Sequence, residues 1–145
     1  MPTLVYPVAD VVERLAGESA IKQVGLAVDM NTALATPPRT DNAVYVISTT
    51  KGGPLKFTGN PIQQARETTI VLLVWVRNHG DATAVRKAVD ALLGAIDARV
   101  AGWTPGNPFS SLVFNASRDE FAQAQYAVVQ VTYTSSWNFS AQRQP

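Results

Sequence analysis

The sequence predicts an α+β fold of two layers, in which a mainly antiparallel or mixed sheet of about five strands carries two helices on one face. Three observations support this fold. Patterns typical of helices and strands follow one another in the order α-β-β-β-α-β-β. Residues 68–76 are apolar, β-branched and aromatic without polar alternation, which is typical of a strand covered on both faces. Residues 82–101 repeat apolar side chains at steps of three and four, and such a stripe has to cover a sheet.

The N-terminal segment predicts a helix and then a strand. A helix is expected over residues 8–16, because Pro7 suits a first turn and apolar side chains fall on one face: Val8, Val11, Val12 and Leu15. Residues 21–29 predict a strand, in which Gly25 marks a weak point or a bulge. Residues 30–42 are rich in turn and extended formers, so they predict a long connection without an element of its own.

The middle of the chain predicts a strand, a long loop and the central strand. Residues 43–48 form the second strand, and residues 49–63 form the loop, which holds two glycine- and proline-containing turns. Loops of this length in compact domains are usually functional or mobile. We therefore expect this loop to contact a partner through Lys51, Leu55, Lys56, Phe57 and Asn60.

The central strand is followed by a predicted turn and a long helix. Asn78, His79 and Gly80 are turn formers, and Asp81 can cap the helix by accepting hydrogen bonds from its first turn. The apolar stripe of this helix consists of Val85, Ala88, Val89, Leu92, Leu93 and Ile96. Gly102 supplies a left-handed stop, so the helix is expected to end within residues 98–101.

The C-terminal third predicts two more strands. Residues 105–111 form a loop, residues 111–116 a strand and residues 117–120 a polar connection. The last strand covers residues 123–137, with Ala127, Val129, Val131 and Tyr133 on one face and Tyr126, Val128, Gln130 and Thr132 on the other. The tail from about residue 140 has no apolar pattern and is expected to be flexible.

Composition narrows the class of protein. The chain has 145 residues, which suits one domain over residues 1–145, and its hydrophobic content of 46% argues against disorder. It has no cysteine, no apolar run near the length of a membrane span and no secretory signal at residues 1–6, so we expect a cytosolic site of synthesis. The net charge is +1 and the charges are scattered, which disfavours a dedicated nucleic-acid binder.

The search for catalytic chemistry finds no convincing group, so we expect no enzyme, no cofactor and no metal. His79 and Asp81 are the sole conceivable base and orienter pair, but no serine motif accompanies them. Asp119 and Glu120 are adjacent and would point to opposite faces of a strand. The pair of glycines at 52 and 53 lacks the lysine and hydroxyl residue of a phosphate-binding loop.

The apolar central strand raises the question of what covers its second face. Either the sheet curls on itself or another copy of the chain covers it, and we favour an oligomer. The expected ring interface consists of Trp75, Tyr126, Val128, Trp137 and Phe139, with core packing as the alternative role of these side chains. The two lysines of the 49–63 loop are weak evidence for a binding surface in a monomer. A symmetric ring would repeat their charges in every copy and so strengthen this evidence.

The whole pattern resembles the tail terminator, or tail completion, proteins of tailed bacteriophages. The resemblance covers the helix over 8–16, the strand over 43–48, the loop through Gly59, Asn60 and Pro61, the strand over 67–77, the helix from Asp81 and the final strand ending in residues 133–139. It is one of element order, length and texture, and no position-specific motif can be carried over. The site residues above therefore rest on loop length and aromatic placement.

The resemblance implies a structural virion protein without enzymatic activity. Such a protein forms a hexameric ring that caps the head-proximal end of the tail tube, stops its polymerisation and presents a surface for head and neck joining. The implied partners are the tube protein, a neck or connector protein and, in a contractile tail, a sheath protein, with DNA only passing through the lumen and no membrane. Assembly is implied in the host cytoplasm. The alternatives are another neck, head-completion or minor tail protein and, remotely, a ligand-binding or hydrolytic domain using His79 and Asp81.

Overall fold

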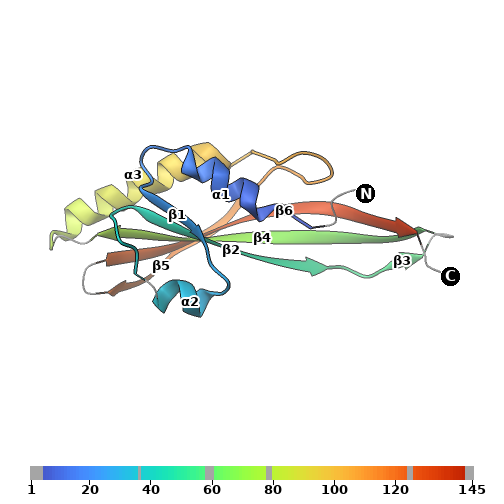
Figure 1. The fold of residues 1–145 in the computed structure, drawn as a ribbon, viewed down its shortest axis with the longest axis horizontal. Helices are drawn as coiled ribbons and strands as arrows, with labels where there is room; N and C mark the ends of the chain where they lie inside the picture. Colours follow the sequence, from blue (N-terminus) through green and yellow to red (C-terminus); the bar gives the residue numbers. More distant parts are fainter. Residues whose placement is uncertain (1–4, 36, 58–60, 78–79, 124–125, 143–145) are drawn as a thin grey trace.

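The computed structural model describes residues 5–35, 37–57, 61–77, 80–123 and 126–142. The elements in chain order are α1 (Val8–Ala16), β1 (Gln23–Leu26), α2 (Met30–Ala35), β2 (Ala43–Gly52), β3 (Lys56–Phe57), β4 (Pro61–Arg77), α3 (Ala82–Val100), β5 (Val113–Gln123) and β6 (Tyr126–Gln142). Figure 1 shows them as one elongated molecule.

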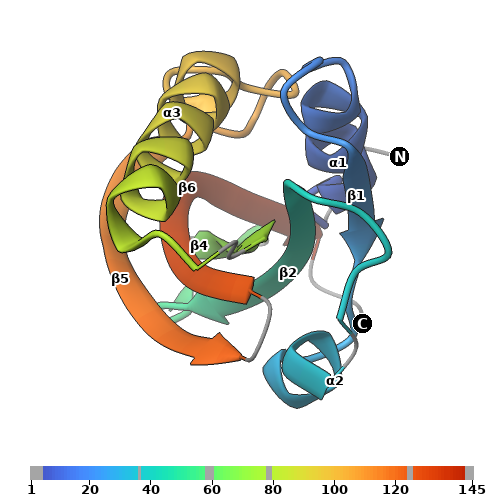
Figure 2. The ribbon, with the colours of Figure 1, turned by 90° about the vertical axis from the view of Figure 1, so that its left-hand side faces the viewer.

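The strands form one mixed sheet in the order β1-β2-β4-β6-β5, with β3 also paired to β4. β1 runs parallel to β2, and every other pair is antiparallel. Figure 2 shows that this sheet is strongly curved. The predicted α+β class with a mixed sheet is confirmed, but the described residues form six strands and three helices rather than about five strands and two helices.

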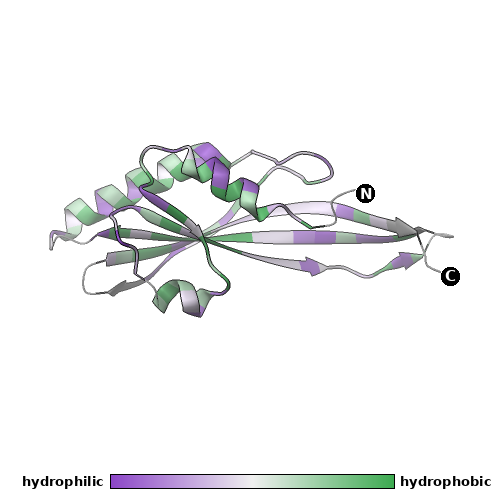
Figure 3. Ribbon diagram, in the orientation of Figure 1, coloured by the Kyte–Doolittle hydropathy of each residue, from purple (hydrophilic) through white to green (hydrophobic). Residues whose placement is uncertain are grey.

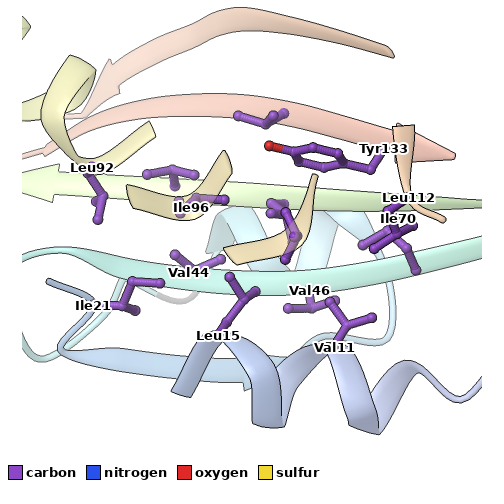
Figure 4. Close-up of a cluster of buried hydrophobic side chains, with 14 of the residues drawn as sticks. Val11, Leu15, Ile21, Val44, Val46, Ile70, Leu92, Ile96, Leu112 and Tyr133 are labelled. Carbon is purple, nitrogen blue, oxygen red and sulfur yellow. The ribbon is translucent and has the colours of Figure 1, made fainter. Parts of the chain in front are cut away.

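The main core lies between the sheet and the pair of helices α1 and α3, which cover the same face (Figures 1 and 2). Val11 and Leu15 of α1 and Leu92 and Ile96 of α3 are almost fully buried there. They pack on side chains of β2, β4 and β6, including Val44, Val46, Ile70 and Tyr133 (Figure 4). Two helices on one face were predicted, and α1 and α3 take this arrangement.

The second face of the sheet is covered by the chain itself. Ala33 of α2 packs in a second core cluster with Tyr45, Trp75 and Tyr126, and the Trp75 ring meets the two tyrosine rings edge to face at 6.2 and 5.4 Å. The prediction that residues 30–42 form only a connection is therefore wrong. The physical reason is a short helix in which Asp29 accepts a hydrogen bond from the Thr32 N–H at 2.7 Å. The argument that another copy must cover this face falls with it.

The two long helices confirm their sequence signals. α1 covers residues 8–16 as predicted. The Asp81 side chain accepts hydrogen bonds from the N–H groups of Thr83 and Ala84, and α3 ends at Val100 just before Gly102, whose φ is +78°. Both ends follow the local rules for helix caps, because a carboxylate satisfies free N–H groups at the start and glycine adopts a left-handed conformation after the end.

β2, β4, β5 and β6 are longer than predicted, whereas β1 covers only Gln23–Leu26 of the predicted residues 21–29. β2 continues through residues 49–52 and β3 occupies residues 56–57, so much of the predicted 49–63 loop is strand. The predicted connection at 117–120 lies inside β5, and β6 continues through residues 140–142 of the predicted flexible tail. These polar segments are strands because their backbone groups pair with β4 or β6, and such pairing does not require apolar side chains.

One end of the sheet extends beyond the helices as a thin projection, which we call the β-arm (Figure 1). It comprises residues 48–57 of β2 and β3, residues 61–68 of β4 and residues 135–142 of β6. β3 pairs with Ile62 and Gln63 on the side of β4 away from β6, so it continues the track of β2 after a break at residues 53–55. The strands change from mainly hydrophobic in the body to mainly polar along the arm (Figure 3).

Candidate assembly surface

The predicted partner-binding residues gather along one side of the β-arm. Lys51 lies near the end of β2, and Lys56 and Phe57 form β3. Leu55 lies in the break between these two strands. Leu55 is 50% exposed and Phe57 is 55% exposed, so two large apolar side chains two positions apart are open to solvent on the arm. Lys51 makes an exposed ion pair with Glu67 of β4, with 3.7 Å between the charged atoms. Asn60 lies outside the described residues.

The predicted ring-interface residues lie mostly inside the protomer. Trp75, Tyr126, Val128 and Trp137 are at most 5% exposed, and they pack against other side chains of the same chain. Phe139 is half-buried on the β-arm. A contact of these residues with a neighbouring copy stays a prediction, but the four buried side chains offer almost no surface for it. Their position supports the alternative role of core packing.

Arg66 organises the base of the β-arm. Its guanidinium lies 3.8 Å from the centre of the Phe139 ring and 5.4 Å from that of Trp137. Its Nε donates to the Gln64 side-chain oxygen at 2.8 Å. A planar guanidinium stacks well on aromatic faces, so this contact joins β4 to β6 at the margin of the main core, which includes Trp137 and against which Phe139 packs.

Gln64 in turn connects β4 to the break between β2 and β3. Its side-chain amide donates to the Gly53 carbonyl oxygen at 2.8 Å. The carboxamide occupies the space over Gly52, where a Cβ atom would overlap it. A side chain at position 52 would therefore displace the Gln64 carboxamide, and no positive φ angle calls for glycine there.

A row of aromatic side chains connects the β-arm to the body. Phe109 lies edge to face between Tyr6 and Trp137, with ring centres 5.1 Å apart on each side. All three are buried. The Tyr6 hydroxyl has no hydrogen-bond partner in the described part of the chain, and burial, followed by the nearby charge of Asp10, raises the pKa of Tyr6 to about 12.

Sequence reasoning did not single out Arg66, Gln64 or Phe109. A signal for Gln64 and Arg66 was available in the polar run at residues 63–69. If the strand predicted from residue 68 is continued towards the N-terminus, alternate residues of this run lie on the same face. Phe109 lies in an irregular segment, where no periodicity identifies a buried side chain.

Two open grooves adjoin these features. One has a volume of about 590 Å³ at the base of the β-arm, between Pro108 and the glycines at 52 and 53, with Arg66 and Trp137 in its wall. The other has a volume of about 410 Å³ between α3 and β5, and Phe114 and Tyr133 line it. The Tyr133 hydroxyl donates to Asp97 at 2.8 Å, and burial together with this bond raises the pKa of the tyrosine. Neither groove brings a nucleophile and a base together.

The residues considered for catalysis have structural contacts instead. The Asp81 carboxylate caps α3, and His79 lies outside the described residues. Asp119 pairs with Arg86 at 3.3 Å, and Glu120 pairs with Arg118 at 2.8 Å. Among the described residues, no three acidic or histidine side chains are placed to hold a metal ion. None of the helices in the described ranges combines the length and hydrophobicity of a membrane span.

The sequence profile of the family described as phage tail terminator protein matches residues 3–143. The chain belongs to this family. The resemblance inferred from the sequence is thereby confirmed, and it supports a structural role of this tail terminator family member in the phage tail. A chain from the solved virion of a native gene transfer agent particle has a similar fold, with a TM-score of 0.57 and 15% sequence identity. The similarity covers 93% of this chain and 100% of that chain, and at this identity it shows the fold alone. No curated protein matches the chain.

Proposed function

We propose that this chain forms a ring of about six copies that caps the head-proximal end of the tail tube, ends tube polymerisation and provides the surface for head and neck joining. The observation that carries the proposal is the β-arm, a three-stranded projection with exposed apolar residues near its end. Family membership and the virion neighbour support the same role. The ring assembles in the host cytoplasm, becomes part of the virion and lets DNA pass through its lumen.

Termination of a tube is a problem of specificity. The end of a growing tube exposes subunit surfaces that recruit the next ring, so a terminator must match these surfaces on one side and offer no copy of them on the other. Head-to-tail contacts that close into a ring leave two chemically different ends. A chain with an arm at one end of its sheet and helices around the other meets this requirement.

The outer end of the β-arm is the proposed contact with the tube or the neck. Leu55 and Phe57 provide apolar area, and Lys51 and Lys56 add positive charge beside it. Exposed aromatic side chains of this kind dominate the energetics of protein interfaces. A neck or connector protein binds the opposite end of the ring, and a sheath protein binds its outside if the tail is contractile.

The test uses a phage from which the gene is deleted and variants supplied in trans. The double variant Leu55→Ser and Phe57→Ser is expected to give overlong tails that do not join heads, whereas Val28→Ser, which removes an apolar side chain that is 90% exposed on the body, is expected to give normal tails. Electron microscopy measures tail length. Tails of normal length that stay unattached in the gene deletion would instead favour a neck or head-completion protein.

A further inference from the structure

We infer that neighbouring copies in the ring proposed above pair their β-arms edge to edge. The free edge of β6 in one copy forms a parallel ladder with the β2 and β3 edge of the next. This inference names the ring-forming surface and depends on the ring. It replaces the buried residues of the body with backbone groups of the β-arm as the contact between copies.

The first free edge belongs to β6. β5 pairs with β6 only as far as Thr134, and beyond it Ser110 bonds to both backbone groups of Ser136, with distances of 2.9 and 2.8 Å. Backbone groups of successive strand residues point to opposite sides, so Asn138 and Ser140 direct theirs the same way as Ser136. No strand in the described part of the chain pairs with β6 there.

The second free edge belongs to β2 and lies on the opposite side of the arm. β1 accompanies β2 only to Val46, whose carbonyl oxygen accepts the last such bond, from the Ala27 N–H at 3.0 Å. By the same alternation, Ser48, Thr50 and Gly52 point their backbone groups outward. As far as the described residues go, the β-arm is therefore a three-stranded sheet that is open on both sides.

The β6 edge lacks the features that normally keep strand edges apart. Proteins protect exposed edges with lysine, proline or bulges. Residues 134–142, Thr-Ser-Ser-Trp-Asn-Phe-Ser-Ala-Gln, contain no charge, no proline and no glycine, and β6 pairs with β4 through them without interruption. An uncharged strand with a bare edge is a template for pairing with another chain.

The geometry of the arm favours a second copy as that partner. β2 and β6 both run antiparallel to β4, so they run parallel to each other. In a ring all arms point the same way, and β6 of one copy therefore meets β2 of the next in parallel. On both edges the outward backbone groups belong to even-numbered residues. The side chains of even-numbered residues, however, lie on one face of the sheet in β2 and on the other face in β6. Val44 of β2 packs in the core with α1, whereas Tyr126 of β6 packs in the second cluster with α2. A parallel ladder needs this offset, because each residue bonds to the two residues that flank its neighbour.

Closing the arms in this way would pair both edges of every β-arm, while β1 and β5 would stay the outer strands of the sheet in the body. The six described residues of β6 beyond Ser136, at about 3.3 Å each, would give a collar in which about 20 Å of strand is paired. Its wall would consist of the polar strands of the β-arm. The bare edge of β6 then has a function in the assembly and is exposed only in the single chain.

Proline scanning tests the pairing, because proline removes one backbone N–H. The Ser140 N–H points away from β4, so Ser140→Pro leaves the β4–β6 ladder intact but blocks the outer edge, while Ser140→Ala keeps the N–H. Thr50→Pro and Thr50→Ala form the same pair on the opposite edge, and both lose the 2.8 Å contact of the Thr50 hydroxyl with Thr68. Light scattering gives the assembly mass, and circular dichroism checks the fold.

Wild type and both alanine variants are expected to form rings, and both proline variants are expected to fall to the single-chain mass of 15.6 kDa with an unchanged circular dichroism spectrum. Rings in the proline variants would overturn the arm pairing while leaving the ring itself standing. A wild-type mass of two chains would overturn head-to-tail pairing in favour of a two-fold contact. A wild-type single chain at every concentration would also overturn the pairing, and the tail-length experiment would then decide the proposed function separately.

Discussion

Replacing Phe109 with leucine tests whether the aromatic row connects the β-arm to the body. Leucine keeps most of the apolar burial but removes both edge-to-face contacts, with Tyr6 and with Trp137. Each such pair contributes about 0.5–1.5 kcal/mol beyond area burial, so Phe109→Leu should reduce the free energy of unfolding by about 2 kcal/mol. For a domain of this size that loss corresponds to a fall in Tm of about 4–8 °C.

Urea unfolding followed by tryptophan fluorescence measures the change. Phe114→Leu is the matched control, because its ring meets only Tyr133, at 5.9 Å, and is half exposed, so its loss should stay below about 1 kcal/mol. A double-mutant cycle of Phe109→Leu with Trp137→Leu should give a coupling energy of about 1 kcal/mol. Additive losses, or a Phe109→Leu protein as stable as wild type, would refute the idea that the row acts as one unit.

Three further changes are predicted. Tyr6→Phe should stabilise the protein by about 1 kcal/mol at neutral pH, because it removes a buried hydroxyl that has no partner among the described residues. The pKa of Tyr6 is raised to about 12 in the folded protein, so the stability of the wild type should fall as the pH rises from 10 towards 12. Thermal melts of the variant should show less of this fall. Asp81→Ala should cost about 1 kcal/mol through the lost helix cap and Asp81→Asn much less, as urea titration would reveal. Gly52→Ala should displace the Gln64 carboxamide and lower the free energy of unfolding by about 1 kcal/mol, and faster hydrogen exchange in the β-arm would report this. Gly53→Ala is the control and should be neutral, because a Cβ atom there meets only the Ala65 carbonyl at 3.6 Å.

The parts of the fold that could be predicted from the sequence carry strong local signals. α1 and α3 have a hydrophobic period of 3.6 residues, and Asp81 and Gly102 mark the ends of α3. The centre of β4 is recognisable because it is apolar on both faces. In these segments the side chains that define the element are also those that the core buries.

The β-arm could not be predicted, because tertiary pairing and not composition makes its strands. Residues 49–52 and 56–57 contain glycine, lysine and threonine, and by propensity alone they are a loop. They become strand because β4 provides a partner on that side. The structure therefore places Lys51, Lys56 and Phe57 in strands where the sequence predicts a loop, and Leu55 in the break between β2 and β3, while a partner contact through these residues stays a prediction.

The ring-interface prediction followed from a sound premise with one missing element. An apolar face does need a cover, but residues 30–35 provide it as α2, and the short length of this helix hid it among turn formers. Because side chains of the chain itself cover both faces of the body, the proposed ring would form most readily through another kind of surface. Free strand edges are such a surface, since their backbone groups can bond to a neighbour without exposing apolar side chains in the single chain.

In the proposed ring, this division of surfaces would account for termination as well as for ring closure. Edge pairing acts around the ring and would use up both sides of every β-arm, so it cannot recruit a further ring along the tube. What remains available along the axis differs between the two ends: Leu55 and Phe57 near the end of the arm, and α3 with its neighbouring loops at the body. A tube end that accepted the arm would then be followed by no second arm-accepting surface on the far side, and growth would stop after a single ring.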